Sequence, residues 1–132
     1  MEAPPGLGAR VSDYLFDTVI LIDALRDVRP AKAELLRQKR NWISRVSWIE
    51  LMAQSRPEES ELVEEFLRHF SVVEMSEEVA RRAAAICAQR PAMTLPDAIL
   101  WASAQTSGKI LVTRNTRDFP AQMPGIRIPY SL

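Results

Sequence analysis

The sequence is poor in the residues that most often mark redox or histidine chemistry. It has one cysteine, Cys87, and one histidine, His69. A single cysteine excludes a disulfide within the chain, and its scarcity favours a reducing compartment, so we expect a cytoplasmic protein. His69 closes an acidic stretch with helical character, residues 57–69. A favourable interaction with the helix dipole explains this histidine more simply than catalysis does, so a histidine-based nuclease mechanism is not expected.

The chain also lacks an excess of charge and a long apolar run. Its 17 basic and 17 acidic residues give zero formal net charge, so any binding of nucleic acid depends on local Lys and Arg. The longest apolar runs, such as residues 19–22, are far too short to span a bilayer, and we expect no membrane association. Residues 1–13 lack the apolar stretch of a signal peptide. We therefore expect a flexible tail over 1–13 and one domain over 14–132.

The rest of the sequence alternates between short β-like runs and longer helical ones. This alternation is typical of an α/β domain with a mainly parallel sheet. Strands are expected at 14–17, 42–44, 71–75, 109–113 and 126–128. Helices are expected at 18–26, at 30–40, from Ser47 onward, and at 57–69, 76–89 and 96–107. The last of these is apolar nearly all round, so we expect it to be buried.

Four carboxylates open or close these elements in apolar settings. They are Asp17, Glu50, Asp97 and Asp118. Each has an ordinary structural explanation. Asp17 is placed to cap a helix, and Asp118 lies in a polar loop as a turn residue would. Glu50 follows Ser47 by three residues, which is the spacing of a capping box, and Asp97 follows Thr94 in the same way.

The case for a functional role rests on burial and position. Asp17 ends a strand, where ligands bind in open α/β sheets, and Asp97 heads the helix that we expect to be buried. Glu50 shares a helix face with apolar residues, and a carboxylate there needs a cation or donors to offset its desolvation. If the four acids converge, they form a pocket for a hard divalent cation, Mg²⁺ or Mn²⁺. Their mutual repulsion would raise carboxylate pKa values in the metal-free protein.

The order and context of the four acids resemble the motifs of the PIN-domain nucleases, and especially of the toxins in VapBC-type toxin–antitoxin pairs. The similarity runs from about Tyr14 to the C-terminus. It rests on FDTVILIDAL around Asp17, VSWIEL around Glu50, LPDAILWASA around Asp97 and LVTRNTRDF around Asp118. There are two departures from the family pattern. Val19 stands where the family often has Asn, and Ser47 stands where Thr is frequent.

The resemblance implies a three-layer α/β/α fold with a short, mainly parallel sheet. It also implies an endoribonuclease in which the four acids hold Mg²⁺ or Mn²⁺ and a metal-activated water hydrolyses the RNA phosphodiester bond. Thr113 and Asn115 can hydrogen-bond the acids or the bound water. Arg114 and Arg117 flank the pocket, either as contacts to RNA phosphates or as ordinary solvated arginines.

The resemblance further implies a homodimer and a cognate VapB-type antitoxin that inserts a C-terminal segment into the active-site groove. Contact with DNA is expected only through that antitoxin. Exposed apolar faces at 34–38 and 57–69 are plausible docking surfaces.

Two other hypotheses stay open. A regulatory binding component would use the acid pocket to capture an arginine from a partner without cutting RNA, although the retention of all four acids argues against it. A DNA-directed nuclease would use the same metal chemistry, and the active-site residues alone do not distinguish it. A second basic stretch, residues 37–45, is either a solvated face or an RNA track near Glu50.

Overall fold

The computed structural model describes residues 13–132, so the tail expected over 1–13 lies outside the described residues except for its last residue. The strands are β1 (Tyr14–Phe16), β2 (Asn41–Ser44), β3 (Ser71–Val73), β4 (Ile110–Val112) and β5 (Ile126–Arg127). The helices are α2 (Thr18–Leu25), α3 (Arg29–Leu35), α4 (Arg45–Gln54), α5 (Ser60–Leu67), α6 (Glu77–Gln89) and α7 (Leu95–Thr106). Within residues 13–132, every helix is too short or too polar to pass through a bilayer.

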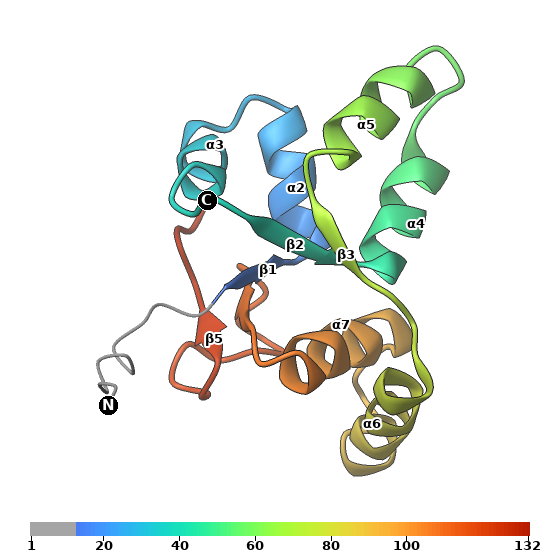
Figure 1. Ribbon diagram of the computed structural model, residues 1–132. Helices are drawn as coiled ribbons and strands as arrows, with labels where there is room; N and C mark the ends of the chain where they lie inside the picture. The colour runs from blue at the N-terminus through green and yellow to red at the C-terminus, as the bar shows by residue number, and fades with distance from the viewer. Residues whose placement is uncertain (1–12) are drawn as a thin grey trace, which may run out of the picture.

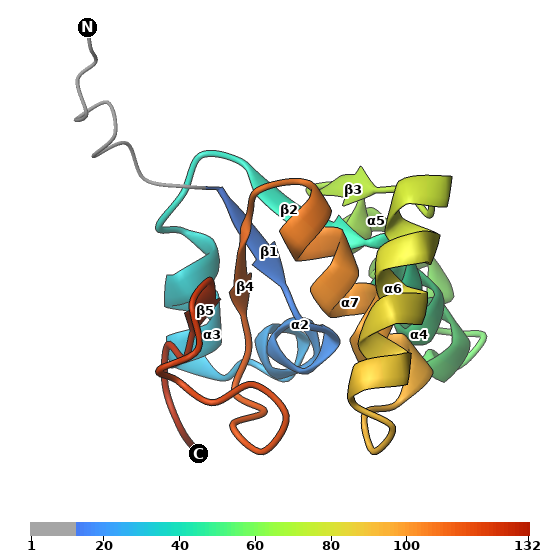
Figure 2. The same ribbon diagram turned by 90° about the horizontal axis from the view of Figure 1, so that it is seen from below.

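The five strands form one parallel sheet in the order β3-β2-β1-β4-β5. Figure 1 shows α2, α3, α4 and α5 on one face of this sheet and α6 and α7 on the other. Figure 2 shows the second face, where α6 packs alongside α7. The α/β class and the three-layer α/β/α arrangement are therefore confirmed.

The core is divided between the two faces of the sheet because successive strand residues point in opposite directions. Leu15 of β1 and Leu111 of β4 pack with α6 and α7, whereas Phe16 and Val112 pack with the helices of the other face. All four side chains are fully buried. A sheet covered on both faces needs such continuous apolar runs instead of an alternation with polar residues.

The chain changes direction across the sheet next to β1. After β1 it moves outward to β2 and β3, and α6 and α7 then return it to β4 on the other side of β1. Such a switch point leaves a crevice at the carboxyl ends of the two central strands, where ligands bind in open α/β sheets. Phe16 pairs with Val112, so the next residues, Asp17 and Thr113, are neighbours at that edge. The Asp17 N–H donates to the Val112 carbonyl at 2.9 Å.

The helix that carries Glu50 begins earlier than expected. Its N-cap is Ser44, whose Oγ accepts a hydrogen bond from the Val46 N–H at 3.1 Å. The expected helix start at Ser47 is therefore wrong, and so is the alternative of a capping box from Ser47 to Glu50, because Ser47 lies inside the first turn and is fully buried. Ser44 ends β2 with the extended backbone that an N-cap requires.

Helix α3 ends at Leu35 instead of near residue 40. Residues 36–40 then form a turn that leads into β2, and they lie at the amino edge of the parallel sheet, opposite the edge that carries Asp17. Residues 37–40 therefore do not lie near Glu50, and of the two alternatives an RNA track beside Glu50 does not fit them. Arg45 does lie at the carboxyl end of β2, but its guanidinium is paired with Glu74.

Replacing Ser44 with Ala is expected to lower the free energy of unfolding by about 1 kcal/mol, because an N–H in the first turn of α4 loses its partner. Urea denaturation followed by circular dichroism measures this change. Ser60→Ala is the control, since the Ser60 hydroxyl donates to the Pro57 carbonyl and caps no N–H. A cost for Ser44→Ala no larger than that of the control would contradict the role of Ser44 as the cap.

Candidate active site

Asp17 and Thr113 form the centre of the site, at the carboxyl ends of β1 and β4. The Thr113 hydroxyl donates to Asp17 Oδ2 at 2.6 Å, and both residues are buried. Asp17 occupies the N-cap position of α2, and its side chain makes no capping hydrogen bond of ordinary geometry. Burial raises the pKa of Asp17 and the charge of Glu50 adds to this rise, while the Thr113 hydroxyl and the nearby N–H groups of Val19 and Thr18 oppose it.

Glu50 reaches the site from the second turn of α4. The Thr18 hydroxyl donates to Glu50 Oε1 at 2.7 Å and lies 2.8 Å from Ser47 Oγ. A hydroxyl has a single proton, so Thr18 donates to Glu50 and accepts from Ser47. The buried Ser47 is thus a support for Thr18 rather than a helix cap. Sequence reasoning missed Thr18 because its partners lie on another helix.

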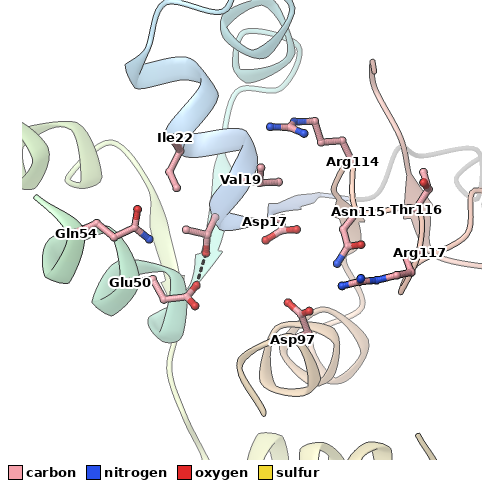
Figure 3. A pocket seen from close by; sticks show the side chains of 11 residues that line it. Asp17, Val19, Ile22, Glu50, Gln54, Asp97, Arg114, Asn115, Thr116 and Arg117 are labelled. Atoms are coloured by element: carbon pink, nitrogen blue, oxygen red, sulfur yellow. Dashed lines mark hydrogen bonds between the residues drawn. The ribbon is translucent and has the colours of Figure 1, made fainter. Parts of the chain in front are cut away.

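Asp97 enters from the first turn of α7, and its carboxyl group points into the pocket (Figure 3). The Asp97 N–H donates to the Thr94 hydroxyl at 3.3 Å, so the expected cap by Thr94 is confirmed. Capping and a place in the site are therefore compatible for this residue. Burial, reinforced by the charges of Asp17 and Asp118, raises the pKa of Asp97 to about 6.

Asp118 is held in the loop after β4 by a local hydrogen-bond network. Asn115 Nδ2 donates to Asp118 Oδ2 at 3.1 Å, and the Asn115 N–H donates to Thr113 Oγ1 at 3.0 Å. Asp118 does not itself line the pocket, but it is close enough to Asp97 to raise that residue's pKa. Thr113 donates to Asp17 and Asn115 donates to Asp118, so both hydrogen bonds that we expected from the sequence to the acids are present.

The side chains of the site line a pocket of about 600 Å³ that is open to solvent. Figure 3 shows these lining side chains. Its acidic lining residues are Asp17, Glu50 and Asp97, and Val19 and Ile22 form its apolar side. Among residues 13–132, no group of three or more carboxylate, histidine or cysteine side chains is arranged as it stands to hold a metal ion. The acids nevertheless offer only oxygen donors and repel one another. Both properties fit a hard divalent cation that draws the carboxylates together.

The two arginines of the loop have different surroundings. Arg114 turns away from the acids towards α2 (Figure 3), where its Nε and Nη2 donate to the buried Asp23 at 2.7 and 3.1 Å. Arg117 is exposed, points into the pocket, and forms no ion pair with another residue of 13–132. Tyr130 also donates to Asp23, at 2.7 Å. Sequence reasoning missed this contact and did not single out Asp23, because both of its partners lie far along the chain.

Asp97 is expected to titrate near pH 6 in metal-free protein. Its pKa is higher in the folded protein than in the unfolded chain, where it is about 4, so the folded state binds the proton more tightly between these values. The free energy of unfolding should therefore fall as pH rises from about 4 to 6, and Asp97→Asn should flatten part of that decline.

Carboxyl ¹³C NMR without divalent ions measures the Asp97 pKa directly. Asp27 is an internal control, because its pairing with Lys32 lowers its pKa. An Asp97 resonance that titrates no higher than that of Asp27 would contradict the electrostatic picture of the site.

Comparisons with known proteins identify the family of this fold. The family model for the PIN domain matches residues 14–122. A chain of a toxin–antitoxin complex from Klebsiella pneumoniae is 36% identical, with 91% of this chain and 100% of that chain covered and a TM-score of 0.84. Comparison with curated proteins gives no match.

Two more distant structures share the fold. DNA-bound VapBC from Salmonella typhimurium is 23% identical over 89% of this chain and 97% of that chain, with a TM-score of 0.72. FitAcB from Neisseria gonorrhoeae is 20% identical over 90% of this chain and 99% of that chain, with a TM-score of 0.68. The family match and the likeness to the Klebsiella chain together lead to one conclusion: this chain belongs to the PIN-domain family.

Proposed function

We propose that this protein is a metal-dependent endoribonuclease and the toxin of a type II toxin–antitoxin pair. The observation that carries the proposal is the meeting of Asp17, Glu50 and Asp97 in one open pocket, with Asp118 beside Asp97. These acids come from four separate segments, and structural caps alone give no reason for them to converge. The 36% identity to a chain of a toxin–antitoxin complex supports the biological role.

In the proposed enzyme, Asp17, Asp97, Asp118 and Glu50 hold Mg²⁺ or Mn²⁺. When bound, such an ion supplies an activated water and neutralises charge that develops on the phosphate. Thr113 orients Asp17, Thr18 orients Glu50, and Asn115 orients Asp118. Donors of this kind fix the direction of ligand oxygens and are typically worth 10- to 100-fold in metal affinity or activity.

The substrate side of the pocket supports recognition of a phosphodiester. The pocket is open to solvent at its rim, and Arg117 is free to approach a phosphate there. Val19 presents an apolar surface at a position where the family pattern often has Asn, so we propose that substrate choice is a property in which this chain differs from that pattern. The preference for RNA over DNA rests on the family resemblance and is decided by experiment.

A partly apolar groove next to the pocket supports an antitoxin partner. It has a volume of about 320 Å³. Its apolar side is formed by Leu25, Leu51, Leu62 and Val63, and Arg26, Ser55 and Glu59 line it as well. Ile22 and Gln54 line both the groove and the acid pocket. A VapB-type segment laid along the groove would therefore reach the acids, which fits inhibition by insertion. The proposed protein is a homodimer, and it contacts DNA only through the antitoxin.

Partner-free protein is expected to cut end-labelled RNA at discrete positions with Mg²⁺ or Mn²⁺, and not with a chelator. Asp97→Asn should reduce the cleavage rate by about 100-fold or more, because a carboxylate that holds the metal is lost. Asp27→Asn is the matched control. Asp27 is an exposed acid with φ of 63°, a conformation that Asn tolerates well.

The outcomes separate the hypotheses. Equal cutting by wild type and Asp97→Asn would remove the support for this active site. Cutting of DNA of the same sequence in preference to RNA would retain the metal chemistry and overturn the ribonuclease assignment. Absence of cleavage by pure wild-type protein on any nucleic acid would favour the regulatory binding component.

Leu62→Glu is expected to weaken binding of the cognate antitoxin by about tenfold or more, because a charge would enter an apolar contact. Leu132→Glu is the matched control. Leu132 is exposed to nearly the same degree as Leu62, and it lies outside the groove and outside both expected docking surfaces. Isothermal titration calorimetry measures both affinities. Equal affinities for the two variants would place the antitoxin elsewhere.

A further inference from the structure

Asp23 connects three distant parts of the chain. It lies on α2, and its carboxylate accepts two hydrogen bonds from Arg114 in the loop after β4 and a third from the Tyr130 hydroxyl near the C-terminus. The Asp23 side chain is only 5% exposed. A buried carboxylate needs such partners, and the bidentate guanidinium provides the most directional of them.

Each of these groups stays in the protonation state that the network needs. Hydrogen bonds from Arg114, and more weakly from Tyr130, lower the pKa of Asp23. Burial and the contact with Asp23 raise the pKa of Tyr130 beyond its ordinary value. The carboxylate therefore remains an acceptor and the phenol remains a donor throughout the neutral range. The hydrogen bonds of Asp23 therefore do not depend on a change of protonation state within the neutral range.

Arg114 stands between the two residues that contact the acids of the site. Thr113 donates to Asp17 on one side of it, and Asn115 donates to Asp118 on the other. The Asn115 N–H also donates to Thr113 Oγ1, and the Phe119 N–H donates to the Asn115 carbonyl. A displacement of the Arg114 backbone would consequently alter the direction of both supporting side chains.

We propose that Asp23 and Tyr130 are positioning residues for the active site: together they hold Arg114, so that Thr113 and Asn115 direct the carboxylates of Asp17 and Asp118. The expected effect on catalysis rests on the proposed function. The positioning of Thr113 and Asn115 by Arg114 does not depend on it. Two of the three guanidinium nitrogens of Arg114 are bonded to Asp23, so Arg114 belongs to the architecture of the site. Arg117 is then the arginine of this loop that meets substrate.

The C-terminal segment thereby becomes part of the active site's support. Residues 128–132 form no helix or strand, and Tyr130 packs at the margin of the core on the face of the sheet that α2 and α3 cover. The contact with Asp23 links this irregular segment to α2 and to the loop that carries Asp118. If this segment loosens, the positions of the acidic side chains are expected to change, although the segment contacts none of them.

Tyr130→Phe is the decisive variant, because it removes one hydroxyl from a partly exposed side chain and leaves the ring in place. Tyr14→Phe is the matched control: Tyr14 is buried on β1 and its hydroxyl makes no hydrogen bond with another residue of 13–132. Asp23→Asn provides a stronger perturbation of the same network. The readouts are amide hydrogen exchange at Asn115 and Phe119, and kcat and KM for a defined RNA substrate.

In Tyr130→Phe, exchange at the Asn115 and Phe119 amides should be about three- to tenfold faster, and kcat should fall by a similar factor, which is what the loss of one hydrogen bond corresponds to. KM should stay within about twofold, since no group that contacts RNA is lost. Asp23→Asn should produce larger changes in the same direction. Tyr14→Phe should leave exchange at these two amides and kcat unchanged.

Unchanged exchange at Asn115 and Phe119 in both Tyr130→Phe and Asp23→Asn would overturn the inference. So would a rise in KM with unchanged kcat, because Arg114 would then act by contacting RNA. If wild-type protein cleaves no RNA but both variants accelerate exchange at these amides, the proposed function fails while the positioning role stands. If wild type cleaves RNA and neither variant alters kcat, the proposed function stands and the inference fails.

Discussion

Parallel pairing of β1 with β4 is the interaction on which the site depends. The pairing of Phe16 with Val112 places Asp17 beside Thr113, and a slip of β1 by one residue would turn Asp17 to the face opposite Thr113. This register is well determined because Leu15 and Phe16 must enter opposite cores. The burial of apolar residues within the strands thus specifies the position of polar residues just beyond them.

The grouping of acids at this edge has an electrostatic cost that the surrounding hydroxyl and amide groups only partly offset. Thr113, Thr18 and Asn115 each donate to a different carboxylate. The raised pKa values of Asp17 and Asp97 show that some repulsion and desolvation remain. Pockets that retain such strain are candidates for function, since a purely structural cluster would have acquired basic partners, as Asp23 has.

Sequence reasoning succeeded where the signal was local. The presence of the five strands and the helix start at Thr94 follow from short patterns, whereas the metal-binding role of the four acids stays a prediction. It failed at α4, because Ser44 and Ser47 are both good caps and only the end of β2 distinguishes them. It also could not pair Asp23 with Arg114 or Tyr130, which are separated from it by 91 and 107 residues. Such contacts depend on tertiary packing, which no periodicity encodes.

The balance of charge around the site bears on how a neutral protein would attract RNA. Net charge is zero, Arg45 and Arg114 are engaged by Glu74 and Asp23, and the basic residues 37–40 lie at the opposite edge of the sheet. A phosphate that approached the pocket without a cation would meet carboxylates and a single exposed arginine, Arg117. Repulsion between unit charges about 4 Å apart is about 4 kcal/mol at an effective dielectric constant near 20. In the proposed enzyme, therefore, the bound cation and not the surface charge makes the pocket attractive to RNA.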